Sequence, residues 1–83
     1  MANCKYETRI AAACPMDDKP DIYEATFESD NIIKVELILE AVAKYATEKA
    51  FQEAITAELA RTLRCKVTTV GYHSGVKTTV VAP

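Results

Sequence analysis

Cys14 and Asp21 are the two residues whose types and spacing point most directly to chemistry. Each lies next to a proline, at the two ends of the segment Cys14-Pro15-Met16-Asp17-Asp18-Lys19-Pro20-Asp21. A cysteine thiol becomes a strong nucleophile when a nearby base takes its proton. A carboxylate can accept that proton and later donate it to a developing anion. If the segment folds back as a loop, it predicts a nucleophile, Cys14, served by Asp21.

A purely structural role is the alternative for both residues. Free cysteine is among the most buried residue types, and Cys14 follows three alanines. An aspartate directly after a proline is common where a turn ends or a strand begins. Cys4 and Cys65 have no such neighbours and are interpreted as structural or incidental.

Glu53 is a candidate binding residue on an expected helix. A carboxylate there can bind the paired N–H donors of a guanine-like ring bidentately. Lys49 lies four residues earlier, so a surface ion pair is the alternative. His73 is expected in a turn, solvated or bonded locally, and 17–19 are expected to form a solvated loop.

Alternating and β-branched segments predict two hairpins that would position these residues. The alternation is clearest in the second segment, where Tyr23, Ala25 and Phe27 share one side. Glycines at both ends of the last connection suit a turn. We expect strands at 5–13, 21–28, 66–70 and 76–82, with the last turn at 71–75.

Two helices are expected between the hairpins. Residues 29–31, Ser-Asp-Asn, are typical helix caps, and Thr47 is a plausible cap for the second helix. Each helix has one apolar stripe at the i, i+3, i+4, i+7 spacing. The first stripe is Val35, Ile38, Leu39 and Val42, and the second is Phe51, Ile55, Leu59 and Leu63.

The element order, ββααββ, predicts an α+β fold in which both helices lie on one face of an antiparallel sheet. With 83 residues the chain is expected to form a single domain, 1–83, with a thin core. The outer strands of such a sheet are open edges, which isolated domains avoid. We therefore expect several copies to join edge to edge in a barrel or ring.

The composition argues against several classes of protein. The net charge is −2 and the ten Lys and Arg residues are scattered, so no basic face for nucleic acid is evident. Three widely spaced cysteines and a single histidine predict neither a disulfide framework nor a metal site. No apolar run reaches the roughly 20 residues of a membrane span, and no signal peptide is evident. We expect a cytoplasmic protein.

The segment from Cys14 to Asp21 resembles the Cys-Pro-x-x-x-x-Pro-Asp signature of 7-cyano-7-deazaguanine reductases and of their relatives, the QueF-like archaeosine synthases. These enzymes have the tunnelling fold, whose element order is similar to the one expected here. The similarity extends from about Ile10 to Ala82. It is closest to the archaeosine synthase, or amidinotransferase, branch in its compact length, its helix pair and its ending through Tyr72-His73-Ser74-Gly75-Val76.

The resemblance implies a role for each candidate residue. Cys14 would attack the nitrile carbon to form a thioimide, and Asp21 would pass the thiol proton toward the nitrile nitrogen. Glu53 matches the purine-anchoring glutamate of the family. Gln52, expected beside it at the substrate, stands where the family usually has histidine. Family members assemble as stacked rings with sites between subunits.

The second half of the reaction distinguishes three functions. The reductases carry a Glu-Ser-Lys-Ser-x-Lys motif associated with NADPH, and this motif is missing here. The resemblance therefore favours ammonia attack, which gives a formamidine without any cofactor, on a 7-deazaguanine nitrile that is free or within nucleic acid. The alternatives are an NADPH-dependent reductase giving 7-aminomethyl-7-deazaguanine, and a non-catalytic tunnelling-fold binding or structural protein. An unrelated small interaction domain is a fourth possibility.

Overall fold

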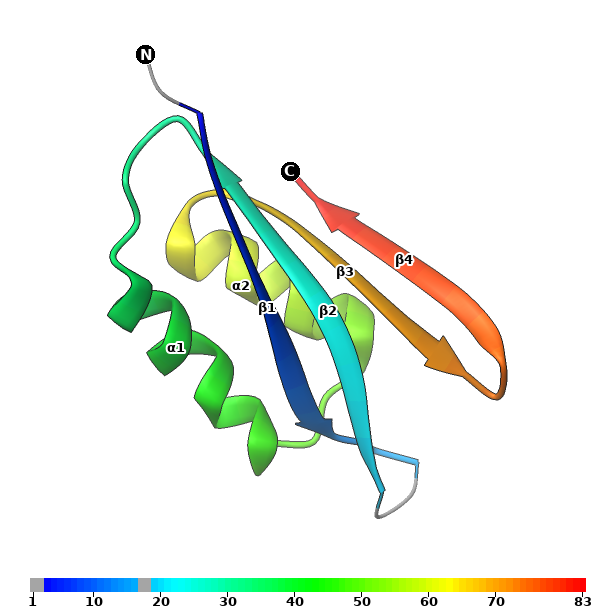
Figure 1. Ribbon diagram of the computed structural model, residues 1–83. Helices are drawn as coiled ribbons and strands as arrows, with labels where there is room; N and C mark the ends of the chain where they lie inside the picture. The colour runs from blue at the N-terminus through cyan, green and yellow to red at the C-terminus, as the bar shows by residue number, and fades with distance from the viewer. Residues whose placement is uncertain (1–2, 17–18) are drawn as a thin grey trace.

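The computed structural model describes residues 3–16 and 19–83. Its elements are β1 (Cys4–Ala13), β2 (Pro20–Ser29), α1 (Val35–Ala43), the short 3-10 helix η1 (Lys44–Ala46), α2 (Gln52–Leu63), β3 (Lys66–His73) and β4 (Val76–Ala82). The four strands form one antiparallel sheet in the order β1-β2-β3-β4. Both helices lie on one face of this sheet (Figure 1). The predicted α+β arrangement is confirmed.

The two hairpins turn at the same end of the sheet (Figure 1). β1 and β2 pair along their whole length, from Cys4 opposite Ser29 to Ala13 opposite Pro20. Residues 17 and 18 of the connecting loop, part of the solvated loop expected at 17–19, lie outside the described residues.

The turn between β3 and β4 is shorter than predicted. Only Ser74 and Gly75 form it, and both have positive φ, 52° and 83°. This pair of left-handed residues is typical of the two-residue turns that match the twist of a hairpin. Strand pairing continues to His73 opposite Val76. The prediction of a turn at 71–75 was therefore wrong, because Gly71 and His73 belong to β3.

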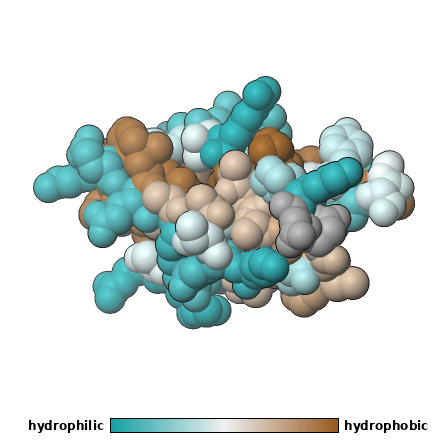
Figure 2. Space-filling view, turned by 90° about the horizontal axis from the view of Figure 1, so that it is seen from below, coloured by the Kyte–Doolittle hydropathy of each residue, from teal (hydrophilic) through white to brown (hydrophobic). Residues whose placement is uncertain are grey.

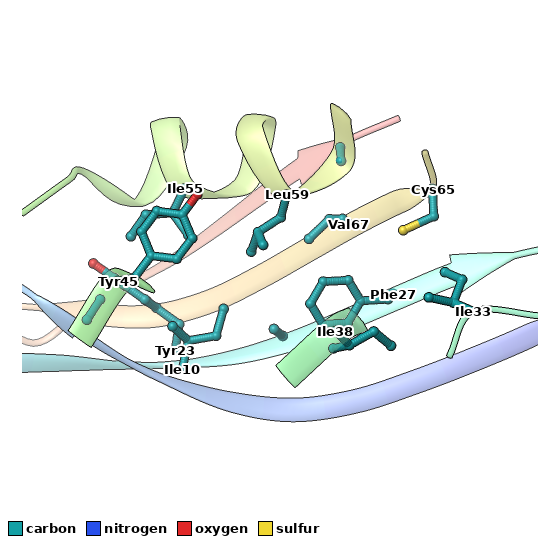
Figure 3. Close-up of a cluster of buried hydrophobic side chains, with 13 residues drawn as sticks. Ile10, Tyr23, Phe27, Ile33, Ile38, Tyr45, Ile55, Leu59, Cys65 and Val67 are labelled. Carbon is teal, nitrogen blue, oxygen red and sulfur yellow. The ribbon is translucent and has the colours of Figure 1, made fainter. Parts of the chain in front are cut away.

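The hydrophobic core fills the space between the sheet and the helices (Figure 3). The sheet contributes alternate residues of each strand, and Tyr23, Ala25 and Phe27 are all buried as predicted. Ile38 of α1, Tyr45 of η1 and the α2 residues Ile55 and Leu59 cover them; the core also contains Ile10, Ala12, Ile33, Ala60, Cys65 and Val67. Burial of this face holds both helices against the sheet.

α1 lies where the sequence predicts it, but its cap and stripe differ. The residue before its first turn is Lys34, and the Ser29 hydroxyl instead accepts a bond from the Asn31 N–H group. Of the predicted stripe only Ile38 is buried, while Val35 and Leu39 are each about half exposed. The physical reason is that α1 contacts α2 along one line of its surface, while most of its other residues are exposed.

α2 begins at Gln52, not after Thr47. The Thr47 hydroxyl donates to the Lys44 carbonyl at 3.4 Å and belongs to the end of η1. Phe51 precedes the helix and is 57% exposed, so the predicted stripe is turned by one residue. The buried residues are Gln52, Ile55, Thr56, Leu59 and Ala60. Gln52 and Thr56 face inward because strand groups satisfy their hydrogen bonds.

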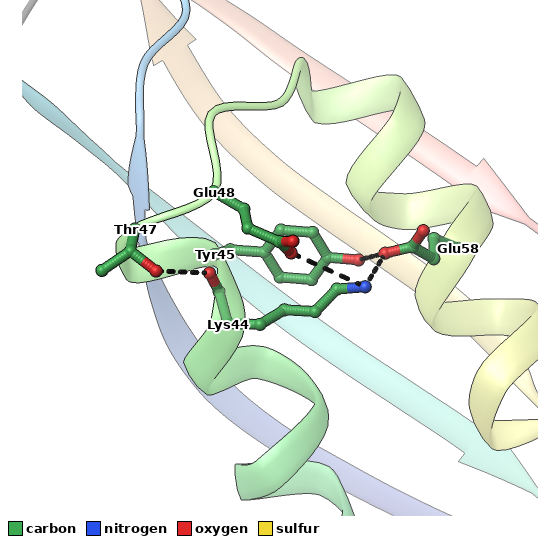
Figure 4. A network of polar contacts seen from close by, with 5 residues as sticks. All are labelled: Lys44, Tyr45, Thr47, Glu48 and Glu58. Atoms are coloured by element: carbon green, nitrogen blue, oxygen red, sulfur yellow. Dashed lines mark hydrogen bonds and ion pairs between the residues drawn. The ribbon is translucent and has the colours of Figure 1, made fainter.

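A polar network fastens η1 to α2 at the rim of the core (Figure 4). The buried Tyr45 donates its hydroxyl to the Glu58 carboxylate, and the Lys44 ammonium group contacts the same oxygen. The Lys44 nitrogen also lies 3.8 Å from Glu48 Oε2. The bond from Lys44, followed by the bond from Tyr45, lowers the pKa of Glu58 below its ordinary value of 4.5.

This network predicts a loss of stability in acid. A carboxyl whose pKa is lower in the folded chain stabilises the fold above its unfolded pKa, and the stabilisation disappears as the pH falls through the folded pKa. We expect the free energy of unfolding to fall below about pH 4.5 less steeply in Glu58→Gln than in the parent. Urea unfolding at several pH values measures this. Glu40→Gln, an exposed α1 change, should keep the parent slope, and equal slopes for all three proteins would contradict the prediction.

Candidate active site

The candidate residues meet in one pocket at the end of the sheet where the hairpins turn. The pocket has a volume of about 260 Å³, and its walls include Cys14, Asp21, Tyr23, Gln52, Glu53 and His73. Figure 2 looks onto this end of the molecule, where hydrophilic and hydrophobic residues are interspersed. All four residues that the sequence singles out for catalysis or binding therefore lie in one place.

The register of β1 and β2 explains why Cys14 and Asp21 converge. Ala12 is fully buried on the helix side of the sheet, and it pairs with Asp21. Residues paired across antiparallel strands share a face, and alternate residues of a strand share a face. Asp21 therefore lies on the helix side, and Cys14, two residues after Ala12, follows at the same end. Both side chains are partly exposed, as a nucleophile and its base require.

Tyr23 holds Asp21 from within the core. Its hydroxyl donates to Asp21 Oδ2 at 3.3 Å, and the residue as a whole is only 2% exposed. Burial raises the pKa of the Tyr23 phenol, and the charge of Asp21 and the hydrogen bond to it raise the pKa further. Tyr23 therefore remains a protonated donor through the neutral range, and it leaves the other lone pairs of the Asp21 carboxylate available.

Gly71 makes room for the Tyr23 ring. A Cβ atom at Gly71 would lie 2.4 Å from Tyr23 Cδ1 and 2.7 Å from Cε1, which is closer than any real contact. On the other side, the rings of Tyr23 and His73 are 5.9 Å apart between centroids and tilted by 50°. The missing side chain at Gly71 thus fixes how Tyr23 reaches Asp21.

Gln52 is the most fully bonded side chain of the pocket wall. Its Nε2 atom donates to the Thr69 carbonyl (3.2 Å), the Thr69 hydroxyl (3.1 Å) and the Thr78 carbonyl (3.0 Å). Its Oε1 atom lies 2.9 Å from His73 Nε2. At 2% exposure, Gln52 ties the first turn of α2 to both strands of the second hairpin. Direct contact of Gln52 with a substrate stays a prediction.

Glu53 lies beside Gln52 in the first turn of α2 and lines the pocket with an exposed side chain. The helix N-terminus favours a negative charge at this position. An accessible carboxylate can accept two N–H donors from a planar ligand. The pocket thus combines the thiol of Cys14 with two carboxylates, those of Asp21 and Glu53.

The sequence does not single out Tyr23 as a site residue, and it predicts His73 in a turn, either solvated or bonded locally. His73 instead bonds Gln52, which lies 21 residues earlier in the chain. The periodicity of β3 carries the signal, because Val67, Thr69 and Gly71 are buried and His73 is next on that face. If Gly71 and Gly75 are both interpreted as turn residues, the predicted strand ends at residue 70. The alternation of buried residues that continues to His73 is then not recognised.

Residues 3–16 and 19–83 contain no group of three His, Cys, Asp or Glu side chains arranged to hold a metal ion. Within the same part of the chain, no helix is long and apolar enough to cross a membrane.

A solved structure is similar to this chain. It is described as the crystal structure of the archaeosine synthase QueF-Like in the apo form, with a TM-score of 0.85 and 23% sequence identity. The superposition covers 99% of this chain and 92% of that one. The chain therefore has the tunnelling fold, and the predicted resemblance is confirmed at the level of the fold. No protein-family model and no curated protein sequence matches the chain.

Proposed function

We propose that this protein is an amidinotransferase-type enzyme that converts a 7-cyano-7-deazaguanine group into the formamidine through a Cys14 thioimide. The observation that supports the proposal most directly is the meeting of Cys14, Asp21 and Glu53 in one pocket. The shared fold with a structure described as an archaeosine synthase supports the same substrate class.

The first half of the reaction uses the β1–β2 side of the pocket. The Cys14 sulfur attacks the nitrile carbon, one π bond of the nitrile breaks, and the thiol proton reaches the nitrile nitrogen through Asp21. Glu53 holds the ring by accepting its N–H donors. The hydrogen bond from Tyr23 keeps the Asp21 carboxylate in place while the proton moves.

In the second half, ammonia attacks the thioimide carbon and Cys14 leaves as a thiolate that regains its proton. The product is the amidine, and the reaction involves no net oxidation or reduction. The missing reductase motif favours this outcome over reduction to the aminomethyl product. Under the reductase alternative, NADPH would be consumed whenever the nitrile is present.

A ring of copies is part of the proposal. β1 and β4 are the two edges of the sheet, and each leaves a row of backbone donors and acceptors open. Joining β1 of one copy to β4 of the next would satisfy both rows. Such joining would also bring further walls to a pocket that lies at one end of the sheet.

The intact mass of the protein after incubation with the nitrile tests the function. We expect the mass to rise by that of the nitrile supplied, either 7-cyano-7-deazaguanine itself or an oligonucleotide that contains it, and then to return when ammonium is added. Cys14→Ala should gain nothing, whereas Cys4→Ala, a matched change at a cysteine outside the pocket, should behave like the parent. An unchanged mass in the parent, or an adduct that survives Cys14→Ala, contradicts the proposal.

A further inference from the structure

The imidazole of His73 lines the pocket with Cys14 and Asp21, although it comes from the other hairpin. We propose that His73 is the base for the second half of the reaction, taking a proton from the incoming amine through its Nδ1 atom. This role rests on the function proposed above, and it adds a catalytic residue that the Cys14–Asp21 pair does not supply.

The hydrogen bonds of Gln52 determine which nitrogen of His73 carries the proton. Two acceptors of Gln52 Nε2 are backbone carbonyls, those of Thr69 and Thr78, so the amide nitrogen must face them. The Gln52 oxygen therefore faces His73, and an amide oxygen only accepts hydrogen bonds. The contact at 2.9 Å is then a bond donated by Nε2–H of His73.

The surrounding hydroxyls leave Gln52 no alternative orientation. Thr56 donates its hydroxyl to the backbone carbonyl of Gln52 at 2.7 Å, so the 2.6 Å contact between the hydroxyls of Thr56 and Thr69 must be donated by Thr69. The Thr69 oxygen then accepts from Gln52 Nε2 at 3.1 Å. Every buried polar side-chain atom of the described residues has a partner in this arrangement. Flipping the amide would set its oxygen against two carbonyls.

With Nε2 protonated, neutral His73 has its lone pair on Nδ1. In the described part of the chain, the bond to Gln52 is the hydrogen bond that His73 makes, and none engages Nδ1. A basic nitrogen is thus held by a buried amide in the wall of the pocket that contains the proposed nucleophile. Gln52 is a positioning residue in this scheme, because it acts on the tautomer of His73.

The chemistry of the second half requires such a base. When ammonia adds to the thioimide carbon, a C–N bond forms and the π pair of the C=N bond moves to the imine nitrogen. The attacking nitrogen must then lose one proton, which His73 Nδ1 accepts. The imine nitrogen pair re-forms the double bond, the C–S bond breaks, and the departing Cys14 thiolate receives the proton.

Asp21 and His73 are positioned independently, and the proposed reaction has two proton transfers in opposite directions. The first takes a proton from the thiol, and the second takes one from the amine. Asp21 is held by Tyr23 and serves the addition of the thiol. His73 is held by Gln52 and serves the removal of a proton from the amine. Asp21 and His73 both line the pocket, and the centroids of the Tyr23 and His73 rings are 5.9 Å apart.

Single-turnover mass spectrometry with His73→Gln tests the role. The amide nitrogen of a glutamine reaches the position of the histidine Nε2 atom, so it can still donate to Gln52 but offers no basic nitrogen. We expect the parent and His73→Gln to form the 7-cyano-7-deazaguanine adduct alike, and adduct decay in ammonium to slow by about 10²–10⁴-fold in the variant. Tyr72→Phe, at the exposed neighbouring position, should decay like the parent.

Two other results would overturn the proposed role of His73, and they can be distinguished from each other. Equal decay in parent and variant removes His73 from the reaction while the proposed function stands. A parent that forms no adduct removes the proposed function and the base role together. Nitrogen-15 NMR of the untagged parent gives a separate test, because His73 is the single histidine of the chain. We expect an N–H signal at Nε2 and an unprotonated Nδ1; the opposite tautomer overturns the role whatever the activity.

Discussion

Asp21→Asn is expected to lower the rate of adduct formation by about 10²–10⁴-fold, the usual contribution of a positioned acid–base group. The asparagine oxygen can still accept the bond from Tyr23, so the fold should be kept. What is lost is the carboxylate that takes the Cys14 proton in the proposed mechanism. The rate is measured from intact mass at a series of times after mixing with 7-cyano-7-deazaguanine.

Asp30→Asn is the matched control, because Asp30 is exposed and lies at the opposite end of β2 from Asp21. It should form the adduct at the parent rate. Unfolding by urea should give the same midpoint for both variants and the parent. An Asp21→Asn protein that forms the adduct at full rate would remove Asp21 from the mechanism and leave Cys14 without its proposed base.

Phe27→Ala is expected to destabilise the fold by about 3–5 kcal/mol, the range for removing a buried aromatic ring. Phe27 is 0% exposed and lies at the centre of the layer between the sheet and the helices (Figure 3). Small domains have total stabilities of about 5–15 kcal/mol, so this loss takes much of the margin. The variant should unfold at a far lower urea concentration.

Ile22→Ala provides the comparison on the same strand. Ile22 is 54% exposed on the face opposite to Phe27, so its removal should change stability much less. Both variants should be measured at one protein concentration, since assembly would make stability depend on concentration. Similar losses for the two variants would show that the layer covered by the helices does not dominate the stability.

Much of the fold follows from local patterns in the sequence. The alternation through Tyr23, Ala25 and Phe27 predicts a strand with one buried face, and the structure has it. The helix positions are also predictable, since apolar spacing at 3.6 residues is a strong signal. The buried stripes of the helices are less predictable, because the elements that pack on a helix determine which of its residues face the core. α2 is turned toward Gln52 and Thr56, polar residues that only strand partners make suitable for burial.

Part of the candidate site also follows from a local pattern in the sequence. The types and spacing of Cys14 and Asp21 indicate a candidate nucleophile and a candidate base within one short segment. His73 and Gln52 are 21 residues apart, and their contact depends on the register between α2 and the second hairpin. No local pattern encodes that register. Gly71 shows the same limit, since its role is to admit the ring of Tyr23 from another strand.

The buried amide of Gln52 has a consequence for motion. It joins the first turn of α2 to Thr69 of β3 and Thr78 of β4, so this half of the pocket should move as one rigid body. The backbone N–H hydrogens of this half of the pocket should therefore exchange with solvent only when the whole unit unfolds cooperatively. This network does not include Cys14, so we expect the pocket to adjust to an entering ligand mainly on the side that carries Cys14. That side would close on the ligand, while the wall formed by α2, β3 and β4 stays in place.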